Sequence, residues 1–188
     1  MFQNLRFYMC FIGVVVLLLA PPCSADSTRS NRIKAAIVYY IAKFVRWPTE
    51  NDSSLHEFRV CYLKPSSFIS EVDKILKNKT VRNKSFRLKL LPSSDSSLQD
   101  QLRTSCEILL LHKSEIPSYQ TFLQDLKDKP ILSICTTSSP QWDECAIQIF
   151  EEKNRGRIAL DRQWVEQSKL VVSSELLSLS IVHPSPRN

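Results

Sequence analysis

Ile108-Leu-Leu-Leu111 is an uninterrupted apolar run near the middle of the chain. A strand with one face in water alternates apolar and polar residues, whereas a strand covered on both faces is apolar throughout. We therefore predict a buried strand here, of the kind found in the interior of a parallel sheet.

The segments on either side of this run predict an α/β fold. Strand and helix patterns alternate three times between Phe58 and Ile134, which favours βαβ units and a parallel sheet with helices on both faces. The stretch from Cys135 to Leu160 holds two strand patterns and no helix, which indicates a hairpin. We predict strands at 58–63, 85–91, 108–111, 131–135, 146–151 and 157–160, and helices at 66–76, 98–103 and 119–127. The expected architecture is a single α/β domain with a mainly parallel or mixed central sheet and a late hairpin.

Helices are also predicted at both ends of this region. After a polar leader at 26–31, Ser30 or Asn31 can cap a helix that ends at Trp47-Pro48, because proline disfavours helix in the preceding residue. Near the C-terminus Asp161 can cap a helix that runs to about Ser168. A final helix, Glu175 to Val182, follows a cap at Ser173 or Ser174.

The N-terminal segment 1–25 is typical of a cleaved signal peptide. Arg6 is followed by the apolar run Phe11–Ala20, two prolines and the small residues of Cys23-Ser-Ala25. The run is shorter than a membrane-spanning helix requires. The prolines before Cys23 also argue against a lipid-attachment site. We predict cleavage after Ala25 and export of a single domain, residues 26–188.

Four cysteines remain after the predicted cleavage: Cys61, Cys106, Cys135 and Cys145. An even number in an exported chain indicates disulfide bonds, and four cysteines allow three pairings. No C-x-x-C motif is present, so a thioredoxin-like redox site has little support.

Charge and composition favour no particular catalytic chemistry. Removal of 25 residues that contain one base and no acid leaves 24 − 19 = +5, without a Lys/Arg block that would indicate nucleic acid. The three histidines lack metal-site spacing. A single glycine beyond residue 25 leaves no room for the glycine-rich catalytic or phosphate-binding motifs. We expect no enzyme activity, metal or cofactor.

Aromatic and basic residues near the end of the first predicted helix are candidates for partner contact. Tyr39, Lys43 and Trp47 follow one another at intervals of four, which puts them on one helix face, and Arg46 lies beside them. Aromatic and basic side chains are common interface anchors. Trp142, in a polar loop between two cysteines, either joins a partner surface or covers the edge of the sheet, and we favour the second.

Several of these segments resemble the YfiR/HmsC family. Lys34-Ala-Ala-Ile-Val-Tyr-Tyr-Ile-Ala-Lys-Phe-Val-Arg-Trp-Pro48 is similar to the K-A-A-x-x-Y-x-x-A-K-F-x-x-W-P pattern of its first helix. The resemblance continues through the Cys61 strand, Cys106–Leu111, Ile131–Ile134 and Leu170–Leu177. It implies the pairings Cys61–Cys106 and Cys135–Cys145.

The resemblance also implies a function. Members of this family are soluble periplasmic repressors of an inner-membrane diguanylate cyclase, whose periplasmic sensor portion they bind, thereby lowering cyclic di-GMP and biofilm formation. Some dimerise, and some are held by an outer-membrane lipoprotein. The residues themselves leave two other readings open. One is a periplasmic small-ligand-binding module that feeds another receptor, such as a histidine kinase, and the other, weaker one is a disulfide-dependent enzyme.

Overall fold

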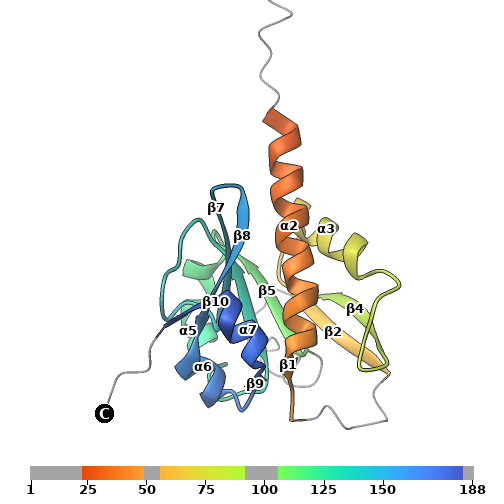
Figure 1. The fold of residues 1–188 in the computed structure, drawn as a ribbon. Helices are drawn as coiled ribbons and strands as arrows, with labels where there is room; N and C mark the ends of the chain where they lie inside the picture. Colours follow the sequence, from red (N-terminus) through yellow and green to blue (C-terminus); the bar gives the residue numbers. More distant parts are fainter. Residues whose placement is uncertain (1–22, 49–55, 92–105, 184–188) are drawn as a thin grey trace, which may run out of the picture.

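The computed structural model describes residues 23–48, 56–91 and 106–183, and a mixed eight-stranded sheet lies at their centre (Figure 1). The strand order is β10-β8-β7-β6-β5-β2-β4-β3, and β1 pairs with β9 in a separate two-stranded sheet. The strands are β1 (Val45–Arg46), β2 (Glu57–Tyr62), β3 (Thr80–Val81), β4 (Lys84–Leu90), β5 (Ile108–His112), β6 (Leu132–Thr136), β7 (Ile147–Glu152), β8 (Arg155–Asp161), β9 (Val171–Val172) and β10 (Ser180–His183). The helices are α2 (Cys23–Phe44), α3 (Ser67–Leu76), α5 (Ile116–Gln124), α6 (Arg162–Gln167) and α7 (Ser174–Leu179).

The directions of the strands confirm the predicted sheet. Five adjacent strands run parallel to one another, in the order β4-β2-β5-β6-β7. Strand β3 is antiparallel to β4, and β8 is antiparallel to β7. β10 lies parallel to β8 at one edge. The fold is therefore a single α/β domain with a mixed, mainly parallel sheet.

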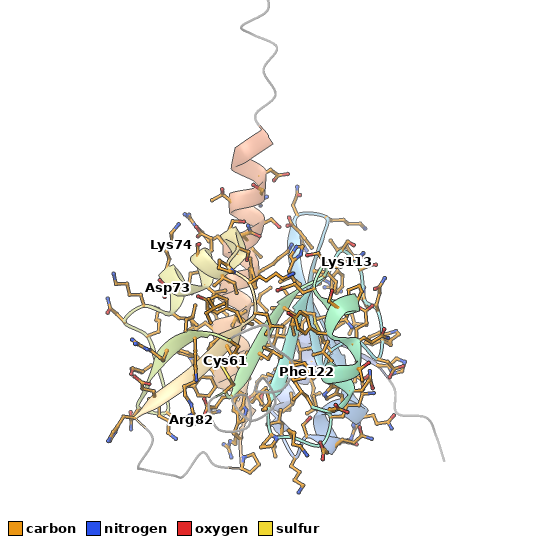
Figure 2. The ribbon with its side chains drawn as sticks, turned by 180° about the vertical axis from the view of Figure 1, so that it is seen from behind. Cys61, Asp73, Lys74, Arg82, Lys113 and Phe122 are labelled. Atoms are coloured by element: carbon orange, nitrogen blue, oxygen red, sulfur yellow. A yellow bond between two sulfur atoms is a disulfide. The ribbon has the colours of Figure 1, made fainter. Side chains whose placement is uncertain are left out.

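The crossover from β2 to β4 and the crossover from β5 to β6 run in opposite directions along the sheet, and this places helices on both faces. The chain passes through α3 to β4 on one side of β2 and later places β5 on the other side. Right-handed crossovers in opposite directions put their helices on opposite faces. Seen from behind, α5 lies in front of the sheet and α2 behind it (Figure 2).

Helix α3 packs beside α2, and polar contacts join the two. The amide of Asn31 donates to Ser67 Oγ at 3.0 Å, and Arg32 lies 3.7 Å from the Glu71 carboxylate. A hydrogen bond from Lys74 lowers the pKa of the Glu71 carboxyl, and Arg32 adds to this effect. The first half of α2 projects beyond the sheet (Figure 1).

The apolar run that predicted a buried strand lies at the centre of the core. Ile108, Leu109, Leu110 and Leu111 in β5 are each at most 1% exposed. Burial of a side chain of this size contributes about 1.5–3 kcal/mol. Parallel neighbours β2 and β6 flank β5, and helices cover both faces of the sheet, which accounts for the absence of polar alternation.

Two terminal predictions were wrong. The predicted leader at 26–31 is helical, because α2 begins at Cys23 and no proline or glycine interrupts the chain before Trp47. The predicted junction after Ala25 therefore lies in the first turn of α2, and cleavage there stays a prediction. The last helix ends at Leu179, because Ser180–His183 pairs with β8 as strand β10.

Other local predictions were confirmed or lie outside the described residues. Asp161 caps α6 by accepting from the Trp164 amide, and Ser173 caps α7 by accepting from the Leu176 amide. Helix α5 starts at Ile116, with Pro117 in its first turn, three residues before the predicted start. The helix predicted at 98–103 lies outside the described residues. No helix in the described ranges is both long and apolar enough to cross a bilayer.

The predicted late hairpin is formed by β7 and β8. Lys153 and Asn154 join them with φ values of 50° and 60°, between the paired residues Glu152 and Arg155. Two consecutive positive φ angles are the signature of a type I′ turn, whose twist matches that of the two strands.

Gly156 in β8 lets this hairpin approach α2 closely. A Cβ atom at this position would lie 2.5 Å from Ile37 Cδ1 and 2.7 Å from Ile33 Cγ2. Both distances are shorter than carbon atoms tolerate, so a side chain here must displace the two isoleucine side chains, the helix or the hairpin.

We expect Gly156→Val to lower the free energy of unfolding by about 1–3 kcal/mol, measured by urea denaturation. If the loss of stability comes from steric overlap with the Ile37 side chain of α2, adding Ile37→Ala to Gly156→Val should recover part of it. An unchanged denaturation midpoint for Gly156→Val alone would contradict this packing.

Candidate functional site

Two disulfides join neighbouring strands, with the pairing that the family resemblance implies. Cys61 in β2 bonds to Cys106 just before β5, and Cys135 in β6 bonds to Cys145 just before β7. The Cα atoms are 5.8 Å and 6.1 Å apart, within the usual range. All four cysteines are buried. The bonds therefore tie the four central parallel strands into two linked pairs.

Glu107, next to the first disulfide, connects three segments. Its carboxylate accepts from the Arg59 guanidinium at 2.8 Å and from the Arg59 backbone amide at 2.7 Å. Its carbonyl accepts from the Trp47 indole at 3.1 Å. Glu107 is 9% exposed, so this ion pair is largely shielded from water.

The prediction that Trp47 extends the helix face of Tyr39 and Lys43 was wrong. Helix α2 ends at Phe44, and Val45-Arg46 forms β1, so Trp47 leaves the helical register. Its side chain is 5% exposed and lies edge-on to Phe58, with ring centroids 5.0 Å apart. Trp47 is a core residue and offers no surface to a partner.

Tyr39 and Lys43 do lie together, with two neighbours, Tyr40 and Lys79, that were not among the predicted contact residues. The rings of Tyr39 and Tyr40 are 6.1 Å apart, and Tyr40 is 55% exposed. Lys43 Nζ and Lys79 Nζ lie 5.7 Å and 5.6 Å from the centre of the Tyr39 ring. We call Tyr39, Tyr40, Lys43 and Lys79 the aromatic–basic surface.

Lys79 reaches this surface through a turn. It follows α3 after Asn78, whose φ of 61° reverses the chain direction before β3. The Tyr39 ring packs against the Phe86 ring of β4, and the two ring centroids are 5.9 Å apart. Contacts that depend on such a tertiary turn have no periodic signal in the sequence.

Arg46 and Trp142 lie away from the helix face. Arg46 is exposed in β1, where it pairs with Val171 of β9. Trp142 is half-buried, and its ring lies 4.5 Å from the His183 ring of the edge strand β10. That position agrees with the covering role favoured for Trp142. A partner role for Arg46 or Trp142 stays a prediction.

Arg82 secures the end of α2 that carries the aromatic–basic surface. Its guanidinium donates to the carbonyls of Ala42, Lys43 and Val45 at 3.1, 3.1 and 2.6 Å. The last carbonyls of a helix lack partners within the helix, and a cation there also complements the helix dipole. Figure 2 labels Arg82.

Arg82→Met should lower the free energy of unfolding by about 1–2 kcal/mol, because the three carbonyls lose their charged donor. Thermal or urea denaturation measures the change. Arg87→Met, an exposed arginine of β4, is the matched control and should change stability by less than about 0.5 kcal/mol. Equal effects of the two variants would show that Arg82 has no capping role.

The described residues contain no cluster of three or more His, Cys, Asp or Glu side chains that could hold a metal ion. Their most distinctive features are the two buried disulfides, the Glu107 contacts and the aromatic–basic surface. These features define a class, namely a disulfide-linked, extracytoplasmic α/β domain.

The family model described as YfiR/HmsC-like matches residues 31–181 of this chain. The chain belongs to that family, whose members are regulatory rather than catalytic proteins. A search of curated proteins found no match.

Proposed function

We propose that this protein is a periplasmic repressor of an inner-membrane diguanylate cyclase. It binds the periplasmic sensor portion of the cyclase, which lowers cyclic di-GMP and biofilm formation. Family membership over residues 31–181 is the observation that carries the proposal. The two disulfides support it, because such bonds persist in the oxidising periplasm.

The aromatic–basic surface is the contact that we propose for the cyclase. Tyr40 supplies a large exposed ring, and Lys43 and Lys79 supply two positive charges beside it. An aromatic anchor with flanking charges is typical of a binding hot spot, and the charges select an acidic partner. The sensor portion would accordingly present acidic side chains around an apolar depression.

A rigid frame holds this surface, which favours recognition without a large rearrangement. Arg82 fixes the end of α2, and Phe86 supports Tyr39. The Cys61–Cys106 bond fixes β2, which is the neighbour of the β4 strand that carries Phe86. Reduction of that bond would loosen the support beneath the aromatic–basic surface.

Deletion of the gene tests the proposal in the cell. Cyclic di-GMP and biofilm should rise on deletion and return to the starting level when the wild-type gene is restored. The variant Tyr40→Ser/Lys43→Glu should fail to restore repression even when it accumulates to the wild-type amount. Unchanged cyclic di-GMP after deletion would contradict the proposed function.

A further inference from the structure

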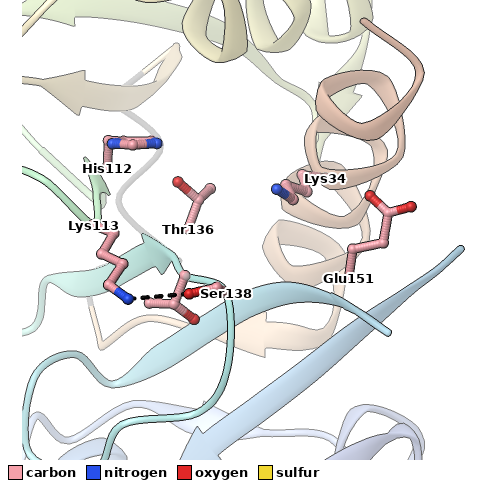
Figure 3. Close-up of a pocket in the computed structure, with 7 residues that line it drawn as sticks. Lys34, His112, Lys113, Thr136, Ser138 and Glu151 are labelled. Carbon is pink, nitrogen blue, oxygen red and sulfur yellow. Dashed lines mark hydrogen bonds between the residues drawn. The ribbon is translucent and has the colours of Figure 1, made fainter. Parts of the chain in front are cut away.

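A pocket opens where β5 and β6 end, with a cavity volume of about 360 Å³ (Figure 3). Its lining residues are Lys34, His112, Lys113, Thr136, Thr137, Ser138 and Glu151. Thr136 stands between His112 and Lys34 in the close-up. A cavity of this size falls within the range of small-ligand sites.

The topology makes this edge of the sheet a binding position. Ligands of open α/β sheets bind beyond the carboxyl ends of the parallel strands, close to the point where the strand order reverses. Here the reversal lies between β2 and β5, because the chain places β4 on one side of β2 and β5 on the other. The pocket lies at the carboxyl ends of β5 and β6, next to that point.

Two buried hydroxyl groups of the pocket lack a hydrogen-bond partner among the residues that the structure describes. Thr136 Oγ1 and Thr137 Oγ1 are shielded from solvent and form no hydrogen bond within the described part of the protein. Thr136 and Thr137 are 4% and 5% exposed. Buried hydroxyls are normally satisfied, and an unsatisfied one is destabilising. A ligand that accepts hydrogen bonds would supply the missing partner.

The charged groups of the pocket select a negative ligand. Lys34 is half-buried on α2, and among the described residues its ammonium has neither a hydrogen bond nor an ion pair. Lys113 Nζ donates to Ser138 Oγ at 3.0 Å, which holds a second ammonium at the rim. Glu151 is the only carboxylate among the described lining residues, so two ammonium groups face one acid.

We infer that this pocket binds a small molecule through a carboxylate or phosphate group, with Lys34 as the charged anchor and Thr136 as a hydroxyl donor. Both groups present oxyanion acceptors to ammonium and hydroxyl donors. His112 Nδ1 is engaged with Ser114 Oγ at 2.9 Å, so the rest of its ring faces the ligand as a wall. This site shares no residue with the aromatic–basic surface, so it stands apart from the proposed function.

Titration of the purified protein tests this inference, with inorganic phosphate in one series and succinate in another. Amide NMR signals of Thr136, Thr137 and Ser138 should shift to saturation with at least one of them, with a dissociation constant of about 1 mM or lower. Saturation by phosphate alone identifies a phosphate ligand, and saturation by succinate alone a carboxylate ligand. Potassium chloride at equal ionic strength should leave the three signals in place.

Two variants separate this site from surface charge. Lys34→Gln should weaken binding about tenfold or more, since it removes the charged donor. Thr136→Val preserves the side-chain volume and should also weaken binding. Arg29→Gln removes an exposed charge from the same helix and should bind like the wild type. The inference fails if neither anion saturates the signals, or if Lys34→Gln binds as tightly as the wild type.

Discussion

Replacement of Cys61 and Cys106 together by alanine is expected to lower the free energy of unfolding by about 4 kcal/mol. The two residues are 45 positions apart, so the bond removes much conformational freedom from the unfolded chain. Such a loss is large against the total stability of about 5–15 kcal/mol that is usual for a domain. Urea denaturation of the wild type and the double variant measures it.

The second disulfide provides the internal comparison. Cys135 and Cys145 are 10 positions apart, so their replacement by alanine should lower the free energy of unfolding by about 3 kcal/mol. All four cysteines are buried, which makes the change in packing similar in the two variants. A smaller loss for the Cys61/Cys106 variant than for the Cys135/Cys145 variant would refute the loop-length explanation.

Glu107→Gln should lower the free energy of unfolding by about 3 kcal/mol. The amide keeps the shape of the side chain but removes the negative charge opposite the partly buried Arg59 guanidinium. The loss should appear in chemical denaturation, and the intrinsic tryptophan fluorescence should also change, because the Trp47 indole donates to the backbone carbonyl of the same residue.

An exposed ion pair is the control for this variant. Arg162 and Glu166 are 2.8 Å apart, one turn apart on α6, and both are more than half exposed. Exposed pairs contribute little, so Glu166→Gln should change stability by less than about 0.5 kcal/mol. Equal losses for Glu107→Gln and Glu166→Gln would rule out a special role for the shielded pair.

The sequence predicted those parts of the fold that rest on local patterns. The apolar run of β5 predicted a buried parallel strand, and the paired strand patterns after Cys135 predicted the hairpin. Caps such as Asp161 and Ser173 were also correct, because capping needs only a side chain and the backbone three residues away. The disulfide pairing came from the family resemblance, since four cysteines alone allow three arrangements.

The errors have a common physical origin in tertiary contacts. The sequence continues helical spacing as far as Trp47. In the folded protein, the pairing of β1 with β9 ends the helix at Phe44, and the Trp47 side chain points into the core. The pairing of β10 with β8 likewise converts the end of the last predicted helix into a strand.

The candidate site was predicted only in part. Tyr39 and Lys43 are neighbours because both are on one helix, as the sequence indicated. Lys79 and Arg82 reach the same helix from the α3–β4 connection, and the pocket unites Lys34 with residues that follow β5 and β6. Residues so distant along the chain share no spacing rule, so only the folded structure brings them together.

The most direct measurement of the central claim is binding of the purified protein to the purified periplasmic sensor portion of the organism's diguanylate cyclase. The account predicts saturable binding that weakens at least about tenfold in Tyr40→Ser/Lys43→Glu. Lys64→Glu makes the same charge change at another exposed lysine and should retain binding. Absence of binding by the folded wild-type protein, or equal affinity in wild type and Tyr40→Ser/Lys43→Glu, would contradict it.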